Sequence, residues 1–385
     1  MHPAARDEFR TSLRLAKEAT TSGVVPATAT KTEAWWLIWL AKCTEWEINP
    51  IQDPSSTHTA DYLAAFAHEV RTGKITPSGK PCRLGNVETA LRAIGQTIAL
   101  LGPNHHDPRL QPNGKLIFAL KRQFQSYEKE DPPPTRVEPL TVELIELAVQ
   151  ACRASNTEKD TCIADMITIG FFFLCRPGEH TVTFDNEPFK LSNVQFYQDD
   201  KPVPIQSSEL LPAADFLTLT FDTQKNGVKG ERIGHGRSTS ATLCPILAVA
   251  HRVAHLNLHE AKPDQPLCSY YHTASKTYRY LASQDITKVL RASALHHPRF
   301  CVNPASVECR SLRTSGAMAL FSRGVDALLI KLVGRWRSDA MLRYLHVQSR
   351  PIMSGLSKLM LAGGDPQLLA ETATMPLPNP TLLVG

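Results

Sequence analysis

The chain has 385 residues, of which 42% are hydrophobic, and it carries 42 Lys and Arg against 37 Asp and Glu. This composition excludes an intrinsically disordered chain, and the length predicts two or three globular domains. No window of the sequence holds 18 consecutive apolar residues, so we expect no membrane span and no membrane partner. The net charge of +5 permits a polyanionic partner without requiring one.

Residues 1–130 are expected to form a domain of four or five helices. Apolar residues at positions 87, 91, 94, 98 and 101 make one helical stripe, with Asn86 as the expected N-cap and Gly102 at the stop. Segment 32–43 is apolar almost all round and is expected to be the buried helix of this domain.

Three consecutive prolines then exclude a helix or a central strand, so residues 131–138 are expected to be a stiff linker. Residues 139–350 are predicted to be mostly helical with a small antiparallel sheet. The strand signal is clearest at 216–221, with partners in 190–198 and 230–238, and helices resume at 244 and from Asp285, Ser311 and Asp326. Residues 351–385 are expected to hold a C-terminal helix and a flexible tail.

The cysteines and the N-terminus predict a compartment. Nine cysteines form no CxxC pair, and no apolar signal segment opens the sequence. We therefore expect reduced thiols in a nuclear or cytoplasmic protein that is not secreted. The acidic residues Asp7, Glu8 and Glu18 interrupt the basic N-terminus, which argues against a transit peptide.

Four positions could carry chemistry: Arg176 in LCRPGEH, Lys225 in TQKNGVKG, Arg313 in CRSLRTSGAMAL and Tyr344 in GRWRSDAMLRYLH. Each has an ordinary alternative when taken singly. These alternatives are an ion pair of Arg176 with Glu179, a solvated loop lysine, a surface arginine and a half-buried tyrosine. However, segment 310–350 holds eight Lys or Arg and two Asp, so the basic excess of the chain is concentrated there.

The order of these motifs resembles the tyrosine recombinases, the phage-integrase family. The elements are R-P-G-E, a lysine in the turn after a strand, R-S-L-R-x-x-G-A, and G-R-W-x-S-x-x-M-x-x-Y-L-H. The resemblance is greatest to the eukaryotic Crypton-like branch and covers about residues 138–350. It implies a two-domain DNA-breaking-rejoining architecture, in which residues 1–130 are a core-binding (SAM-like) DNA-binding domain and residues 139–350 are catalytic.

The resemblance also implies roles. Tyr344 is expected to attack a DNA phosphodiester and form a 3′-phosphotyrosyl bond, which preserves the bond energy and needs neither ATP nor a metal. Arg176 and Arg313 are expected to hold the non-bridging oxygens, which planar guanidinium groups can clamp. Lys225 is expected to protonate the leaving 5′ oxygen, and Glu179 to support the first arginine. A phenol with a pKa of about 10 is a poor nucleophile without such cations.

Two positions depart from the family. Arg310 stands where many relatives carry histidine, and Arg335 where many carry histidine or tryptophan, with Trp336 next. Arginine cannot accept the phenol proton, so water or His346 takes it, or the activity is reduced. We include all three residues in the expected catalytic set. The expected DNA contacts are Arg337, Arg343, Arg92, Lys121 and Arg122.

The expected partner is double-stranded DNA, bound by a homotetramer, with segment 351–361 docking on a neighbouring protomer. We expect an integrase or recombinase of a mobile element. The alternatives are a decayed or domesticated relative that binds DNA without strand exchange, a type IB topoisomerase, and a helical protein-interaction module. His251, His255 and His259 share a helix face, but no HExxH glutamate or cysteine pair accompanies them, so no metal and no cofactor is expected.

Overall fold

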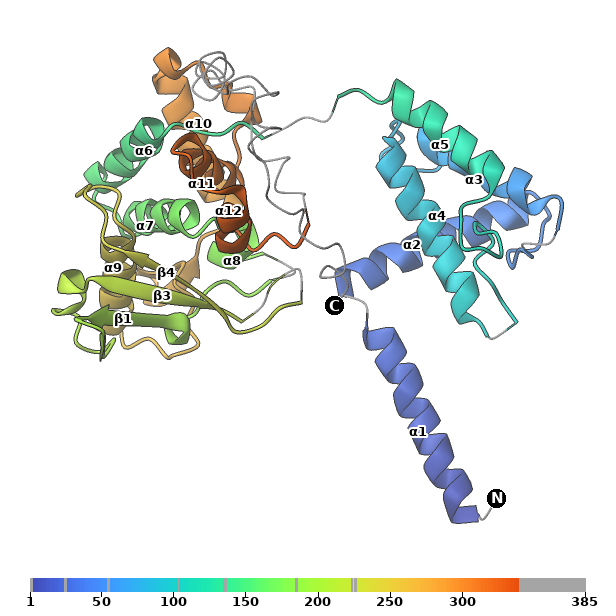
Figure 1. The fold of residues 1–385 in the computed structure, drawn as a ribbon, viewed down its shortest axis with the longest axis horizontal. Helices are drawn as coiled ribbons and strands as arrows, with labels where there is room; N and C mark the ends of the chain where they lie inside the picture. The colour runs from blue at the N-terminus through green and yellow to red at the C-terminus, as the bar shows by residue number, and fades with distance from the viewer. Residues whose placement is uncertain are drawn as a thin grey trace, which may run out of the picture. The chain divides into compact units, whose positions relative to one another are not determined.

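The computed structural model describes residues 3–23, 26–53, 56–102, 104–133, 137–183, 186–222, 224 and 227–338. The chain divides into two compact units, 1–134 and 135–385. Each unit has its own hydrophobic core. The described residues are mainly helical with a small antiparallel sheet, so the predicted fold class is confirmed (Figure 1). Among them, no helix has the length and apolar character that crossing a membrane requires.

The first unit is helical throughout its described elements. Its core centres on Trp39 of α2 and Phe66 of α3, whose rings meet edge to face at 5.1 Å, with Leu91 and Ile94 of α4 beside them. The described side chains of α1 are exposed. The helices are α1 (Pro3–Ser22), α2 (Pro26–Glu45), α3 (Thr59–Thr72), α4 (Leu84–Leu100) and α5 (Phe118–Glu130).

Two predictions for this unit were wrong. Helix α4 begins at Leu84, so Asn86 lies inside its first turn and is not the N-cap. The cap comes from a distant residue, because the carboxylate of Asp131 accepts the backbone N–H of Leu84 at 2.9 Å. Segment 32–43 is buried along one face only, since Leu37 on its other face is 58% exposed.

The second unit is built around α7, whose residues 162–171 are all buried. This helix packs against α6, α9, α10 and α11, which explains why its sequence is apolar on every side (Figure 1). The helices of this unit are α6 (Val142–Ala154), α7 (Glu158–Phe172), α8 (Pro177–His180), α9 (Pro245–Leu258), α10 (Ser283–His296), α11 (Ser311–Ser322) and α12 (Ala327–Val333).

A four-stranded antiparallel sheet of order β2-β1-β3-β4 completes the second unit. Gly227 and Gly230 take positive φ angles of 78° and 73° in the β3–β4 connection, as the turn prediction requires. A second hairpin, β5–β6, was not predicted. The strands are β1 (Val194–Gln198), β2 (Lys201–Val203), β3 (Phe216–Phe221), β4 (Glu231–Gly236), β5 (Ser269–His272) and β6 (Thr277–Tyr280).

Candidate functional site

The motif R-P-G-E forms the short helix α8 just after the end of α7. Leu174 takes a left-handed φ of 47°, which turns the chain, and Pro177 at the first helical position fixes the start of α8. Glu179 then folds back onto Arg176. Its Oε2 accepts the backbone N–H of Arg176 at 2.7 Å, and its Oε1 accepts the side-chain Nη1 at 2.8 Å. The local sequence therefore places a carboxylate directly against the first motif arginine.

Glu179 gathers two further arginines from later motifs. Nη2 of Arg335 lies 2.8 Å from Oε2 of Glu179, and Nη1 of Arg313 lies 4.0 Å from the same oxygen. Glu179 is only 3% exposed. Burial acts to raise the pKa of this carboxyl, but the charges of Arg335, Arg313 and Arg176 outweigh it and hold the pKa below its ordinary value. We call these four residues the Glu179 cluster.

Arg313, on α11, is buried against the turn after α7 and the end of α12. Its guanidinium donates to the carbonyl of Leu174 at 3.0 Å and to that of Gly334, and it lies 4.2 Å from the ring centroid of Trp336. Helix α11 reaches this position because Gly316 has no side chain. A Cβ there would lie 2.4 Å from the carbonyl oxygen of Phe171. Trp336 thus packs against the second motif arginine.

Arg335 is buried as well, and it approaches the same oxygen of Glu179 as Arg313 does. It bonds to three backbone carbonyls, those of Phe173 and Val333 at 3.0 Å and that of Leu174 at 3.3 Å. Its guanidinium carbon lies 3.6 Å from the ring centroid of Phe221, the last residue of β3. The strand that leads towards Lys225 therefore ends at the Glu179 cluster.

The structure brings five of the predicted site residues together: Arg176, Glu179, Arg313, Arg335 and Trp336. Arg310 is an exposed surface residue that pairs with Glu308 at 2.7 Å, so its catalytic role stays a prediction. Lys225, Tyr344, Arg343 and segment 351–385 lie outside the described residues. The expected DNA contacts within the described chain are all exposed; they are Arg92, Lys121, Arg122 and Arg337.

Sequence reasoning missed His180 and Phe221. His180 is 1% exposed, and its Nδ1 donates to the carbonyl of Arg176 at 3.0 Å while its Nε2 lies 3.5 Å from Sγ of Cys309. Burial lowers the pKa of His180 to about 4, so the ring is neutral and locks the backbone of the first arginine. The only sequence signal was its place directly after R-P-G-E.

A second buried carboxylate lies in the middle of α7. Asp165 is 0% exposed and pairs with Arg153, with His251 at 3.4 Å and with Arg252 at 3.9 Å. Arg252 is itself fully buried and donates to the carbonyls of Leu267 and Ser269. We call this group the Asp165 cluster. None of its residues belongs to the four motifs.

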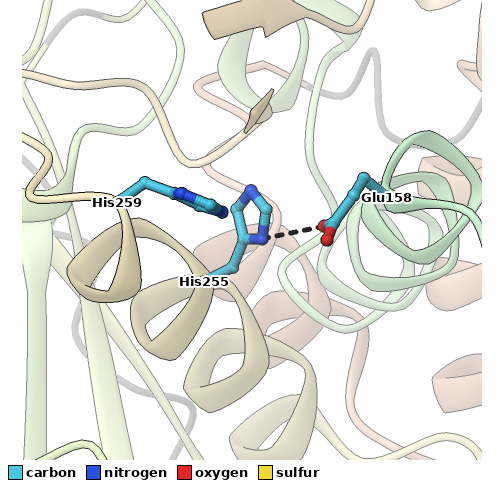
Figure 2. Close-up of side chains that lie close together, drawn as sticks. All are labelled: Glu158, His255 and His259. Atoms are coloured by element: carbon cyan, nitrogen blue, oxygen red, sulfur yellow. Dashed lines mark ion pairs between the residues drawn. The ribbon is translucent and has the colours of Figure 1, made fainter. Parts of the chain in front are cut away.

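His255 of α9 and His259, which directly follows that helix, form a third group with Glu158, the first residue of α7 (Figure 2). Nδ1 of His255 lies 2.9 Å from Oε2 of Glu158, while Nε2 of His255 accepts the backbone N–H of Tyr271 at 3.1 Å. The ring therefore carries its proton on Nδ1 and donates it to Glu158. A metal on Nδ1 would force that proton onto Nε2, against another donor. His259 stacks on Tyr271 at 4.1 Å, so the group fits an anchor for the β5–β6 hairpin.

No protein-family model matches the chain, and no curated protein is similar to it in sequence. Solved structures are similar to it in fold. The XerH site-specific recombinase bound to a palindromic difH substrate has 16% identity over 78% of this chain and 72% of that one, with a TM-score of 0.48. A lambda integrase dimer bound to a COC′ core site has 12% identity over 89% and 96%, with a TM-score of 0.46. The Tn1549 transposon integrase with transposon right end DNA has 10% identity over 79% and 85%, with a TM-score of 0.43.

These solved structures are of the family that the motifs resemble. Their identity to this chain is low, so we base the proposal of function on the residues of the chain itself.

Proposed function

We propose that this protein is a DNA strand transferase that cuts and rejoins duplex DNA through a 3′-phosphotyrosyl bond on Tyr344. One observation carries the proposal: Arg176 and Arg313, far apart in the sequence, meet at a single buried carboxylate. Arg335, from the same motif as Tyr344, joins them there. The proposed activity requires the motifs to share one site.

The charge of the Glu179 cluster suits a phosphodiester. Three guanidinium groups face one carboxylate, which leaves two positive charges in excess. Arg176 is the open member, because its side chain is 24% exposed while those of Arg313 and Arg335 are 2% and 0% exposed. Arg176 is therefore the direct ligand for a non-bridging oxygen, and the buried arginines strengthen the local positive field.

The proposed reaction balances without a cofactor. The phenol oxygen of Tyr344 attacks phosphorus, the bond from phosphorus to the 5′ oxygen breaks, and Lys225 gives that oxygen a proton. Arg310 and Arg335 cannot accept the phenol proton, so water or His346 takes it. The reverse attack by a 5′ hydroxyl rejoins the strand and frees the tyrosine.

Exposed cations on both units supply the proposed DNA contacts: Arg92, Lys121 and Arg122 on the first unit and Arg337 on the second. We further propose a homotetramer on paired sites, encoded by a mobile element. The nine cysteines are free thiols, which is consistent with our proposal of a nuclear or cytoplasmic protein.

A second candidate is a relative that binds DNA without cutting it. Arginines at the two usual histidine positions favour it, since both general-base candidates are lost. The buried state of Arg313, whose Nη atoms bond to backbone carbonyls, favours it as well.

A covalent-adduct assay separates these functions. The protein is incubated with a pool of random-sequence duplexes that carry nicks, and denaturing gels detect DNA joined to protein. The strand transferase forms an adduct that Tyr344→Phe abolishes. A non-cutting relative retains duplexes in a gel shift at low salt and forms no adduct. A protein-interaction module retains no duplex at all. For either DNA-binding candidate, the affinity for duplex DNA falls steeply as the salt concentration rises.

A further inference from the structure

Arg335 stands where the family commonly carries a histidine or tryptophan, yet its side chain has no contact with solvent. Its exposed fraction is 0%. Its Nη1 bonds to the carbonyls of Phe173 and Val333, and its Nη2 bonds to the carbonyl of Leu174 and to Glu179. These four bonds use all four Nη hydrogens of the guanidinium. The Nε–H is buried too and has no hydrogen-bond partner among the described residues.

The bonds of Arg335 join three chain segments at the site. The carbonyls of Phe173 and Leu174 belong to the turn after α7, and the ring of Phe221 under the guanidinium ends β3. Arg335 itself follows α12 with a left-handed φ of 58°, a conformation that non-glycine residues rarely adopt and that aims its side chain inward. No residue with fewer donors can make these bonds, and histidine has at most two.

We propose that Arg335 is a positioning residue: it fixes Glu179, and through that carboxylate Arg176, and it does not bind the DNA phosphate itself. This inference rests on the proposed function for its catalytic consequence. Its structural part, the dependence of Glu179 on Arg335, stands without DNA.

The electrostatics of the cluster support this role. Among the cations that lower the pKa of Glu179, Arg335 has the largest effect, while burial acts in the opposite direction. Removing Arg335 therefore raises the pKa of Glu179. A protonated Glu179 no longer holds Arg176 as a charged pair, so the Arg335 variant loses activity first on the acid side.

The first test uses no DNA. Unfolding by urea is measured for Arg335→Gln, Glu179→Gln and the double variant, with the exposed pair Arg299 and Glu143, 2.6 Å apart, as the matched control. If two side chains act independently, the fold-change in the unfolding equilibrium constant of the double variant equals the product of the fold-changes in the two single variants. At Arg335 and Glu179 we expect a departure from that product of about tenfold or more. The control pair departs by less than about fivefold. Independent effects at both pairs overturn the inference. Arg335→Lys, which keeps the charge, replaces Arg335→Gln if the latter does not fold.

The second test uses the adduct. The duplex that wild-type protein cleaves from the random pool is remade with a neutral methylphosphonate at the scissile position. A residue that only neutralises the phosphate becomes dispensable on this substrate, so activity returns in Arg176→Gln. We expect no return in Arg335→Gln or in Arg335→His. We also measure the rate of adduct formation against pH. We expect the acid limb of this profile to move to higher pH in Arg335→Gln, and this shift to vanish when Glu179→Gln is added.

Recovery of Arg335→Gln on the neutral substrate, or full activity of Arg335→His, overturns the positioning role. If the wild-type protein forms no adduct, the proposed function fails instead, and the unfolding cycle still decides whether Arg335 fixes Glu179.

Discussion

The Glu179 and Asp165 clusters of the second unit share one arrangement of charged side chains. Each buries a carboxylate and surrounds it with cations, and each ties an arginine to backbone carbonyls. They differ in position. Asp165 lies in the middle of α7, between α6 and α9. Glu179 lies where α7, β3 and α12 end, next to the connections that lead to Lys225 and Tyr344.

From this difference we infer that gathered arginines alone do not make a phosphate site. At Asp165 the cations join helices and stabilise the core. At Glu179 similar bonds hold the ends of three elements, and functional residues concentrate on the loops that such rigid ends carry. The proposed function therefore depends on where the cluster lies in the topology.

The largest expected effect contrasts Arg313→Gln with Arg252→Gln. Both arginines are buried and hold backbone carbonyls, so each variant loses about 3–5 kcal/mol of unfolding free energy. Only Arg313→Gln also loses adduct formation, by about 10²–10³-fold per folded molecule, because it removes a preorganised cation. Urea unfolding and adduct rates, measured where both variants are folded, check this. An equal loss of rate in Arg252→Gln would remove the functional distinction between the clusters.

A smaller effect concerns pH. His180 donates to the backbone carbonyl of Arg176 in the Glu179 cluster, and burial lowers its pKa from 6.5 to about 4. Between these values the unfolded chain binds a proton that the folded protein does not, so stability falls as pH falls from 6.5 to 4. The loss is up to about 3 kcal/mol, at about 1.4 kcal/mol per unit. Urea unfolding from pH 7 to 4 measures the slope of the unfolding free energy against pH, and this slope should be smaller in His180→Gln. Some slope remains, because His255 has the same lowered pKa of about 4. An unchanged slope contradicts a neutral, buried His180.

The smallest expected effect concerns the surface beside the Glu179 cluster. Arg337 is exposed and directly follows the residue that packs on Arg313. We expect Arg337→Gln to weaken binding to all duplexes alike and to reduce the slope of log affinity against log salt by about 1. Gel shifts over a range of salt concentrations measure this. Arg299→Gln, an exposed arginine paired with Glu143, serves as the control and should leave the slope unchanged.

The sequence predicted those parts of the fold that have local signals. The helix starts at Ser311 and after Asp326, and the glycines of the β3–β4 turn, are all encoded by neighbouring residues. The start of α4 was wrong because its cap comes from Asp131, across the first unit. The β5–β6 hairpin was missed because its strands have four residues each and are fixed by tertiary contacts such as that of Tyr271 with His259.

The candidate site was predictable in its residue types but not in the direction of its side chains. The motifs predicted Arg176, Glu179 and Arg313, and the pairing of Arg176 with Glu179 follows from their spacing at the start of one short helix. The inward direction of Arg335 depends on carbonyls at the end of α7 and on its own left-handed backbone. No local pattern encodes either one, so the sequence placed Arg335 in the expected catalytic set without predicting its direction.

The central claim is that Tyr344 becomes covalently bonded to DNA, and mass spectrometry of the trapped adduct tests it most directly. After nuclease and trypsin digestion, cleavage follows Arg343, whereas the bond between Arg350 and Pro351 resists trypsin, so the informative peptide runs from Tyr344 to Lys358. We expect a 3′-nucleotide on the phenol oxygen of Tyr344. A nucleotide on any other residue, or DNA-bound protein without a covalent nucleotide, would contradict the account.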